Sequence, residues 1–307
     1  MPEFTSSSGA PRARTAAWLA HRERGSGALL RFFSAASRFL GRPASRVVLR
    51  GITAYFLTFS PRARRESQCY LRLVLQREPT LADQWRHFFC FATAIHDRVW
   101  LAHGELAPFR IDVEGAELLD DAVANGTGAL LLGAHIGSFE VVNAIGLAHG
   151  VDVAMAMYEE NARKLRAMLD ALQPRLRPRV IGLGRTSAML QIRDELERGT
   201  FVGMLADRTL GDEPVHHVSL LGAPAGLPTG PLRAAALLRR RVLFMAGLHL
   251  GGNHYRVLIA PLADFGTLLP GGRSAAIAAA VERYAALLEQ CCRSAPSNWF
   301  NFYRFWK

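Results

Sequence analysis

Residues 128–140 read GALLLGAHIGSFE, a short apolar run that ends in a polar turn with one histidine and one glutamate. Ser138 is placed to cap a following helix, which puts Glu140 in the first turn of that helix. Because positions five apart do not share a helix face, His135 must lie in the turn itself for the Glu140 carboxylate to reach its ring. On these residues alone, a catalytic pair and a capped turn with a surface histidine both remain open.

The chemistry available to such a pair is general base catalysis. A carboxylate that accepts a hydrogen bond from one ring nitrogen fixes the tautomer, and the other nitrogen can then take a proton. This is the arrangement of a serine hydrolase without its serine, so the nucleophile would be a hydroxyl that arrives with the substrate. Backbone N–H groups at the helix start lie where an oxyanion would develop. The sequence contains no G-x-S-x-G elbow, phosphate-binding loop, dinucleotide fingerprint or H-E-x-x-H helix as a competing centre.

The elements that must position this turn are short strands alternating with helices from Pro108 onward. Runs such as FRIDVEG, ALLLGAH, VDVAMAM, RVIGLG and TFVGMLAD read as strands, and helical patterns separate them. This alternation predicts an α/β fold with a mostly parallel central sheet covered by helices on both faces. Ligands bind such sheets outside the carboxyl ends of the strands, where His135 and Asp207 both fall. The pair His216–His217 is predicted to lie in a loop, without metal-ligand spacing.

The first third of the chain has a different character. The formal net charge is +11, and 17 arginines against 7 acidic residues lie within residues 1–110. Six arginines follow helical spacing beside apolar positions: Arg24, Arg31, Arg38, Arg42, Arg46 and Arg50. This pattern predicts basic amphipathic helices over residues 18–107, a composition typical of segments that lie in a membrane interface. Ordinary helices with a solvated arginine face fit the periodicity equally well, whereas nucleic-acid binding is disfavoured because no fingerprint accompanies the charge.

Other sequence features narrow the class of protein. No uncharged apolar run approaches the ~18–20 residues that a membrane-spanning helix needs. The polar N-terminus lacks the apolar core of a signal peptide, so residues 1–17 are expected to form a frayed, disordered tail. The four cysteines have no CxxC spacing and are predicted to be reduced thiols, consistent with a cytoplasmic setting. We expect no metal site.

Longer segments of the chain resemble a known family. GALLLGAHIGSFEVV is similar to the H-x4-D/E segment of the lysophospholipid acyltransferase superfamily, and its flanks resemble the bacterial lipid A biosynthesis late acyltransferase family (HtrB/LpxL type). The block from GTFVGMLADRTLGDEP to LPTGPLRAAALL and the ending APSNWFNFYRFW also resemble that family. With Trp18, Gly41–Arg42 and RHFFCFA, the resemblance covers roughly residues 18–307.

The resemblance implies a single acyltransferase domain over residues 108–307, preceded by the N-terminal helical region. It implies transfer of a fatty acyl group from an acyl carrier protein thioester, or from acyl-CoA in some members, to a hydroxyl of a membrane glycolipid such as a lipid A precursor. No further cofactor is implied. The implied partners are acyl carrier protein, the lipid acceptor and an anionic membrane surface, at the cytoplasmic face of the bacterial inner membrane. A lysophospholipid, aminolipid or pigment acceptor, thioester hydrolysis, and a non-catalytic lipid-binding protein remain alternatives.

The resemblance also implies roles for residues at matched positions. His135 would be the base, Glu140 its orienting partner, and Asp207 a second-shell or acceptor-positioning residue. Further substrate-binding candidates are Arg208, which stands where many members have glutamine, together with Arg185 and Ser138. The aromatic tail NWFNFYRFW is either an interfacial belt beside the acyl groove or a last element packed on the core.

Overall fold

The structure is a computed structural model, and it describes residues 27–101, 104–158, 179–184, 187–209, 213–268 and 271–306. Within the first helix, side chains are described at Ser37, at Phe39 and from Gly41 onward. The predicted tail over residues 1–17 and the helix expected between the strands at 151–157 and 179–184 lie outside the described residues.

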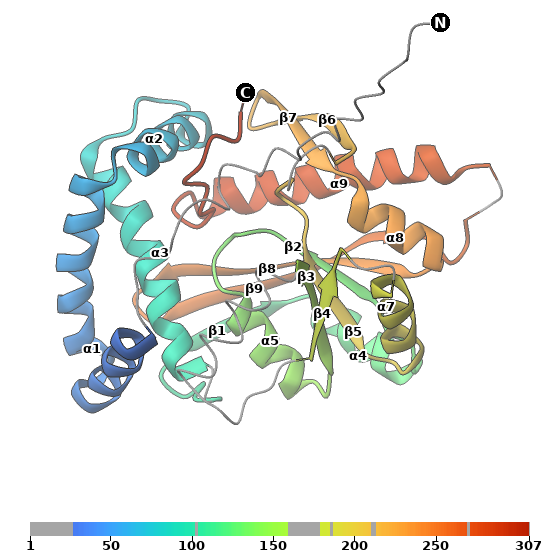
Figure 1. Ribbon diagram of the computed structural model, residues 1–307, viewed down its shortest axis with the longest axis horizontal. Helices are drawn as coiled ribbons and strands as arrows, with labels where there is room; N and C mark the ends of the chain where they lie inside the picture. Colours follow the sequence, from blue (N-terminus) through green and yellow to red (C-terminus); the bar gives the residue numbers. More distant parts are fainter. Residues whose placement is uncertain are drawn as a thin grey trace, which may run out of the picture.

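Three helices form the N-terminal part of the described chain: α1 (Gly27–Phe59), α2 (Pro61–Leu75) and α3 (Leu81–Leu101). α1 is kinked at Gly41, which has a φ of 77° and a ψ of 164°, values that are not helical. α3 lies between α1 and the sheet (Figure 1). None of the helices in the described ranges combines the length and apolar composition that crossing a bilayer requires.

The centre of the fold is a seven-stranded sheet with the order β1-β9-β8-β2-β5-β3-β4. Its strands are β1 (Arg110–Glu114), β2 (Leu130–Gly133), β3 (Val153–Tyr158), β4 (Arg179–Leu183), β5 (Phe201–Leu205), β8 (Arg241–Gly251) and β9 (His254–Asp264). Every neighbouring pair is parallel except β8 with β9, which form an antiparallel hairpin. The prediction of an α/β fold with a mostly parallel sheet is confirmed.

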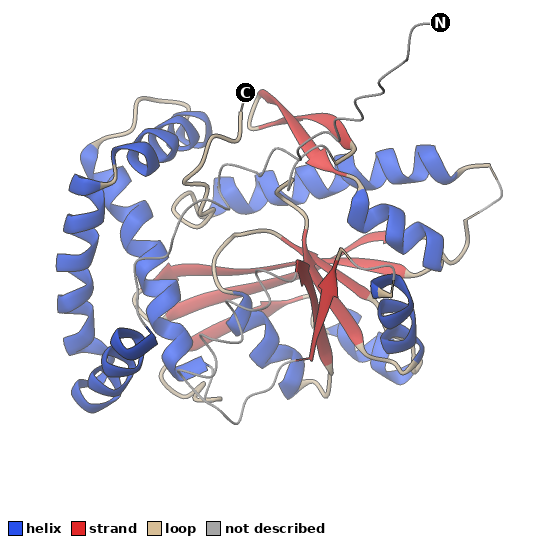
Figure 2. Ribbon diagram, in the orientation of Figure 1, coloured by secondary structure: helices blue, strands red, loops and turns tan. Residues whose placement is uncertain are grey.

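Helices cover both faces of this sheet (Figure 2). α4 (Glu117–Ala124) and α5 (Phe139–Ala148) pack on one face, and Leu131 of β2 belongs to that core. α7 (Ala188–Glu197), α8 (Gly230–Leu238) and α9 (Arg273–Ser294) contribute to the core on the other face, which contains Leu130 and Leu132. Consecutive leucines of one strand thus serve opposite layers, which explains why the strand reads as a continuous apolar run.

The predicted loop at His216–His217 is wrong. These residues lie in β6 (Val215–Leu220), which pairs antiparallel with β7 (Ala223–Pro228) in a separate two-stranded sheet. Leu221 and Gly222 form the connecting turn with φ values of 56° and 82°, the backbone that two-residue hairpins require. The hairpin contacts α9, and Nε2 of His216 lies 3.3 Å from Oε1 of Glu282 on that helix. Two adjacent histidines conceal the strand pattern because they interrupt its apolar alternation.

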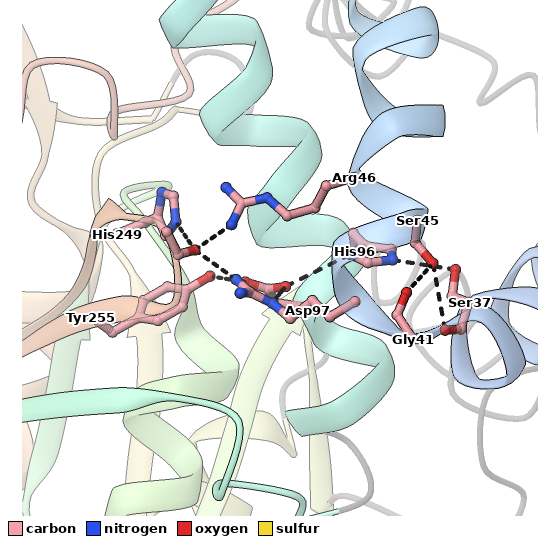
Figure 3. A network of polar contacts seen from close by, with 10 residues as sticks. Ser37, Gly41, Ser45, Arg46, His96, Asp97, His249 and Tyr255 are labelled. Carbon is pink, nitrogen blue, oxygen red and sulfur yellow. Dashed lines mark hydrogen bonds and ion pairs between the residues drawn. The ribbon is translucent and has the colours of Figure 1, made fainter.

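A buried polar cluster joins α1 to α3 and to the β8–β9 hairpin (Figure 3). Asp97 of α3 is fully buried and accepts hydrogen bonds from Nε and Nη2 of Arg42 at 2.7 and 2.6 Å and from the Tyr255 hydroxyl at 2.8 Å. Arg42 and Arg46 also donate to the carbonyl of Gly252 in the hairpin turn, at 2.9 and 2.6 Å. Burial alone would raise the pKa of Asp97, but these donors hold it below its ordinary value, so the aspartate is ionised.

Removing Arg42 should therefore destabilise the protein strongly. Arg42→Ala is expected to lower the free energy of unfolding by about 3 kcal/mol, because it leaves a buried carboxylate without its cation. Denaturant unfolding followed by circular dichroism measures the change. Arg50→Ala on the same helix is the matched control, since Arg50 is exposed and its loss should leave stability unchanged. Equal effects of the two substitutions would contradict the structural role of the cluster.

Candidate active site

The turn between β2 and α5 holds His135 in a fixed position. Its backbone lies against β8, because the Ser138 N–H donates to the Gly247 carbonyl at 2.7 Å. Gly137 has a φ of +60°, and a Cβ atom there would lie only 1.9 Å from that same carbonyl oxygen, so the close approach requires glycine. Ser138 caps α5 as the sequence predicts, its side chain accepting from the Val141 N–H.

The partner of the His135 ring is Asp207, which follows β5. Nδ1 of His135 lies 2.8 Å from Oδ1 of Asp207, and the His135 backbone N–H donates to Oδ2 at 3.1 Å. β2 and β5 are adjacent and parallel, with Gly133 opposite Leu205 in the register. His135 and Asp207 each stand two residues beyond that pair, so both side chains arise at the same level above the sheet edge.

The electrostatics of this pair define the tautomer of the histidine. Burial would raise the pKa of Asp207, but His135, Arg208 and the Trp299 indole hold it well below its usual range, so the carboxylate only accepts hydrogen bonds. Nδ1 therefore carries a proton, and Nε2 of the neutral ring has the lone pair. Burial lowers the pKa of His135, the positive charges of Arg208 and Arg98 lower it further, and the Asp207 carboxylate partly opposes these effects. With 34% of its side chain exposed, His135 is neutral and accessible near pH 7.

The predicted hydrogen bond between His135 and Glu140 is corrected by the structure. Oε1 of Glu140 lies 2.8 Å from Nε of Arg98 on α3, and Oε2 accepts from the Ser138 hydroxyl at 3.1 Å. The carboxylate that contacts a ring nitrogen of His135 is that of Asp207, at Nδ1, and not that of Glu140. Glu140 lies in the first turn of α5, where the helix directs its carboxylate toward α3, and Asp207 approaches the ring from β5.

Arg98 was missed by the sequence reasoning. It brings a positive charge from the N-terminal helices to the turn, and this charge contributes to lowering the pKa of His135. Its neighbour Asp97 is the buried carboxylate of the cluster in Figure 3. The available signal was the polar sequence HDR directly after the mostly apolar run FFCFATAI, but nothing in that signal identifies Glu140 as the partner of Arg98.

The amide groups of the turn are mostly engaged within the protein. The N–H groups of Ile136, Gly137 and Ser138 donate to the carbonyls of Ala134, Asn298 and Gly247, respectively. The sequence predicts oxyanion donors at the start of α5. Of the amides there, those of Phe139 and Glu140, the first two residues of the helix, therefore remain as candidates.

The other predicted substrate-binding residues have varied positions. Ser138 is 1% exposed and its hydroxyl is bonded within the turn, so its described role is that of a cap. Arg208 donates to the Phe300 carbonyl at 2.9 Å and lies over the Tyr303 ring at 4.7 Å, which ties it to the C-terminal segment. Arg185 lies outside the described residues.

The arginines predicted to contact a membrane separate into different groups. Arg42 binds Asp97 and the Gly252 carbonyl, and Arg46 binds the Gly252 carbonyl, so both guanidinium groups are bonded within the protein. Arg50 is exposed. Arg24 and the side chains of Arg31 and Arg38 lie outside the described part of the chain.

The C-terminal aromatic segment begins as part of the core. Trp299 is fully buried and Phe300 is 8% exposed, while Phe305 and Trp306 pack against the same core as Trp299. The interpretation as a packed last element therefore holds for these residues.

The four cysteines are unpaired, as the sequence predicts.

Comparison with known proteins identifies the class of chemistry. The sequence matches no individual curated protein. It does match the family model described as bacterial lipid A biosynthesis acyltransferase, and the match runs over residues 19–307. Because this match spans nearly the whole chain and includes the His135 turn, the protein belongs to the bacterial lipid A biosynthesis acyltransferase family and is an acyltransferase of lipid A biosynthesis.

Proposed function

We propose that this enzyme transfers a fatty acyl group from an acyl carrier protein thioester to a hydroxyl of a lipid A precursor, with His135 as the general base. The observation that carries the proposal is the 2.8 Å contact between Nδ1 of His135 and Asp207 in a chain of this family. The contact leaves Nε2 with a lone pair, as proton abstraction from an acceptor hydroxyl requires.

The proposed reaction proceeds by direct attack. Nε2 of His135 takes the proton of the acceptor hydroxyl while its oxygen bonds to the thioester carbonyl carbon, giving a tetrahedral oxyanion. The oxyanion then collapses, the C–S bond breaks, and the His135 imidazolium returns the proton to the departing thiolate. Asp207 stabilises the imidazolium between these steps, as the carboxylate does in a serine hydrolase. In this proposal the amides of Phe139 and Glu140, the first two residues of α5, stabilise the oxyanion.

A reconstituted transfer assay tests the proposed reaction. Purified enzyme is incubated with acyl carrier protein carrying a fatty acyl thioester and with a lipid A precursor in mixed vesicles, and the lipids are analysed by mass spectrometry. The expected product carries one additional ester-linked acyl chain. Acylation of a lysophospholipid in place of the precursor, or release of free fatty acid without transfer, would contradict the proposed acceptor or the proposed reaction, respectively.

We further propose that the enzyme binds an anionic membrane surface through the corner where α1 meets α2, defined by Tyr55, Phe56, Phe59 and the arginines that follow. The three aromatic side chains are 49%, 44% and 65% exposed, and the Tyr55 ring contacts both phenylalanine rings. Arg62, Arg64 and Arg65 at the start of α2 are exposed beside them. Exposed aromatic rings next to arginines suit the lipid interface, where the rings enter the headgroup region and the cations contact anionic lipids.

Neutralising this corner should weaken membrane binding. A triple change of Arg62, Arg64 and Arg65 to glutamine is expected to reduce binding to vesicles containing anionic lipid by roughly 100-fold, since each arginine contributes about 1 kcal/mol near such a surface. Vesicle co-sedimentation at several salt concentrations measures this loss. The control is glutamine at Arg233 of α8 and at Arg273, the first residue of α9, which are both exposed and lie on other elements than α1 and α2. Binding that is indifferent to the triple change and to salt would refute electrostatic docking at this corner.

A further inference from the structure

The C-terminal segment, residues 296–306, completes the turn that carries His135. The Gly137 N–H donates to the Asn298 carbonyl at 2.9 Å, and the Phe300 N–H donates to the His135 carbonyl at 2.9 Å. Ile136 and Trp299 are bridge partners between these two bonds. Residues 298–300 are thus paired with the turn that carries His135 as a short antiparallel strand would be.

Trp299 also contacts the carboxylate that orients the base. Its indole Nε1–H donates to Oδ2 of Asp207 at 3.0 Å, and the indole is fully buried. Oδ2 accepts a second bond from the His135 backbone N–H. Two donors therefore hold one carboxylate oxygen, which leaves Oδ1 directed at Nδ1 of His135. These bonds fix the orientation of the Asp207 carboxylate.

The N-terminal helices α2 and α3 contact the backbone of Trp299 and of the residues before it. The Trp299 carbonyl lies 2.9 Å from Nε2 of His87 on α3, and the Tyr70 hydroxyl of α2 donates to the Pro296 carbonyl at 2.9 Å. Burial lowers the pKa of His87 to about 4, so its ring is neutral, with Nε2 donating to the carbonyl and Nδ1 accepting from the Ser67 hydroxyl 2.8 Å away. Trp299 thus links α2 and α3 to Asp207.

We propose that Trp299 is a positioning residue of the acyl transfer reaction, which acts by fixing the Asp207 carboxylate against His135. The inference rests on the proposed role of His135 as the base. It differs from ordinary core packing, although Trp299 does pack edge-on against Tyr70 and Trp306. Core packing alone predicts a loss of stability, whereas positioning predicts a change in the properties of the His135 ring itself.

Trp299→Phe separates the two roles because phenylalanine retains an aromatic ring and lacks the N–H donor. The folded variant is expected to have a kcat roughly tenfold lower, with KM values for donor and acceptor within about twofold of wild type. In an Asp207→Asn background the same substitution should have little further effect, since the two residues act through one interaction. Trp306→Phe is the matched control: it is the same change in the same segment, and Nε1 of Trp306 has no hydrogen-bond partner among the described residues.

The deciding measurement is the pKa of His135, followed by NMR and assigned with a His135→Gln variant. The charged groups around the ring, which are Asp207, Arg208 and Arg98 with its partner Glu140, all remain in Trp299→Phe. Loss of one donor leaves more negative charge on Asp207, which favours the imidazolium, so the pKa of His135 should rise by about 0.5 to 1. The acid limb of the kcat/KM profile should move to higher pH by the same amount, because the base must be unprotonated.

This measurement is independent of the proposed reaction. A His135 pKa that does not rise in Trp299→Phe, or that rises equally in Trp306→Phe, would overturn the positioning role even in an active enzyme. A pKa that rises in Trp299→Phe alone, in an enzyme without acyl transfer activity, would support the coupling of Trp299 to the pair and refute the proposed reaction.

Discussion

His135→Ala is expected to lower the kcat of acyl transfer by about 10²–10⁴-fold, the contribution of a well-placed general base. The acceptor hydroxyl has a high pKa, so it needs a base to take its proton. In the turn, the His135 ring is the group that contacts Asp207 and can act as this base. The remaining rate would come from binding and from the oxyanion donors, which the substitution does not remove. Initial rates with a carrier-protein thioester and a lipid A precursor measure the loss.

The variant should retain its fold, so the loss can be assigned to chemistry. The His135 side chain is 34% exposed, and truncating it creates no closed cavity in the core. Circular dichroism and the thermal midpoint provide the control, together with an unchanged KM for the acyl donor. An unaltered transfer rate in the folded variant would exclude His135 as the base.

Asp207→Asn should reduce kcat by a similar factor, about 10²–10⁴-fold, for a reason specific to this site. Two N–H donors, from Trp299 and from the His135 backbone, point at the position of Oδ2. The asparagine amide must therefore place its oxygen there, which turns its NH₂ group toward Nδ1 of His135. An NH₂ donor at that position requires Nδ1 to accept, so the ring proton moves to Nε2 and the base loses its lone pair.

The pH dependence distinguishes this tautomer defect from a simple change in charge. Asp207 also stabilises the imidazolium, so its removal lowers the pKa of His135, and a base that merely titrates at lower pH would be fully active at higher pH. The wrong tautomer persists above the pKa of the ring. The kcat of Asp207→Asn should therefore remain low across the alkaline range, and recovery at high pH would argue against the tautomer explanation.

The sequence predicts which edge of the sheet forms the site, but it does not predict which carboxylate pairs with the base. His135 and Asp207 both follow apolar strands, and the carboxyl ends of parallel strands share an edge. Their direct contact depends on β2 and β5 being neighbours, and strand order arises from the packing of the whole sheet. The sequence favours Glu140 as the partner of His135 because the two residues are only five positions apart. The direction of α5, however, places the Glu140 carboxylate beside Arg98.

The arginines of α1 show a related limit. Arg42, Arg46 and Arg50 have identical helical spacing, and composition treats them alike. Their environments differ because Asp97 and the β8–β9 turn approach only the first two. The partner of a buried arginine lies on another element, so periodicity along one helix cannot separate a structural arginine from a solvated one.

The aromatic tail was recognisable as a motif, and its packing could be anticipated from its apolar content. The contribution of the tail to the site could not be anticipated, because Trp299 and Phe300 bond to residues more than 90 positions earlier in the chain. Such contacts depend on the closure of the fold around the last helix, α9, and leave no local pattern in the sequence.

The most direct test of the central claim, that Asp207 and not Glu140 orients the base, is a comparison of kcat for Asp207→Asn and Glu140→Gln under identical conditions. Glu140→Gln removes a partner of Arg98 and leaves the hydrogen bond at Nδ1 intact. We expect its kcat to fall by about tenfold, well short of the loss in Asp207→Asn. A larger loss in Glu140→Gln, with Asp207→Asn nearly as active as wild type, would contradict the account and restore the His135–Glu140 pair.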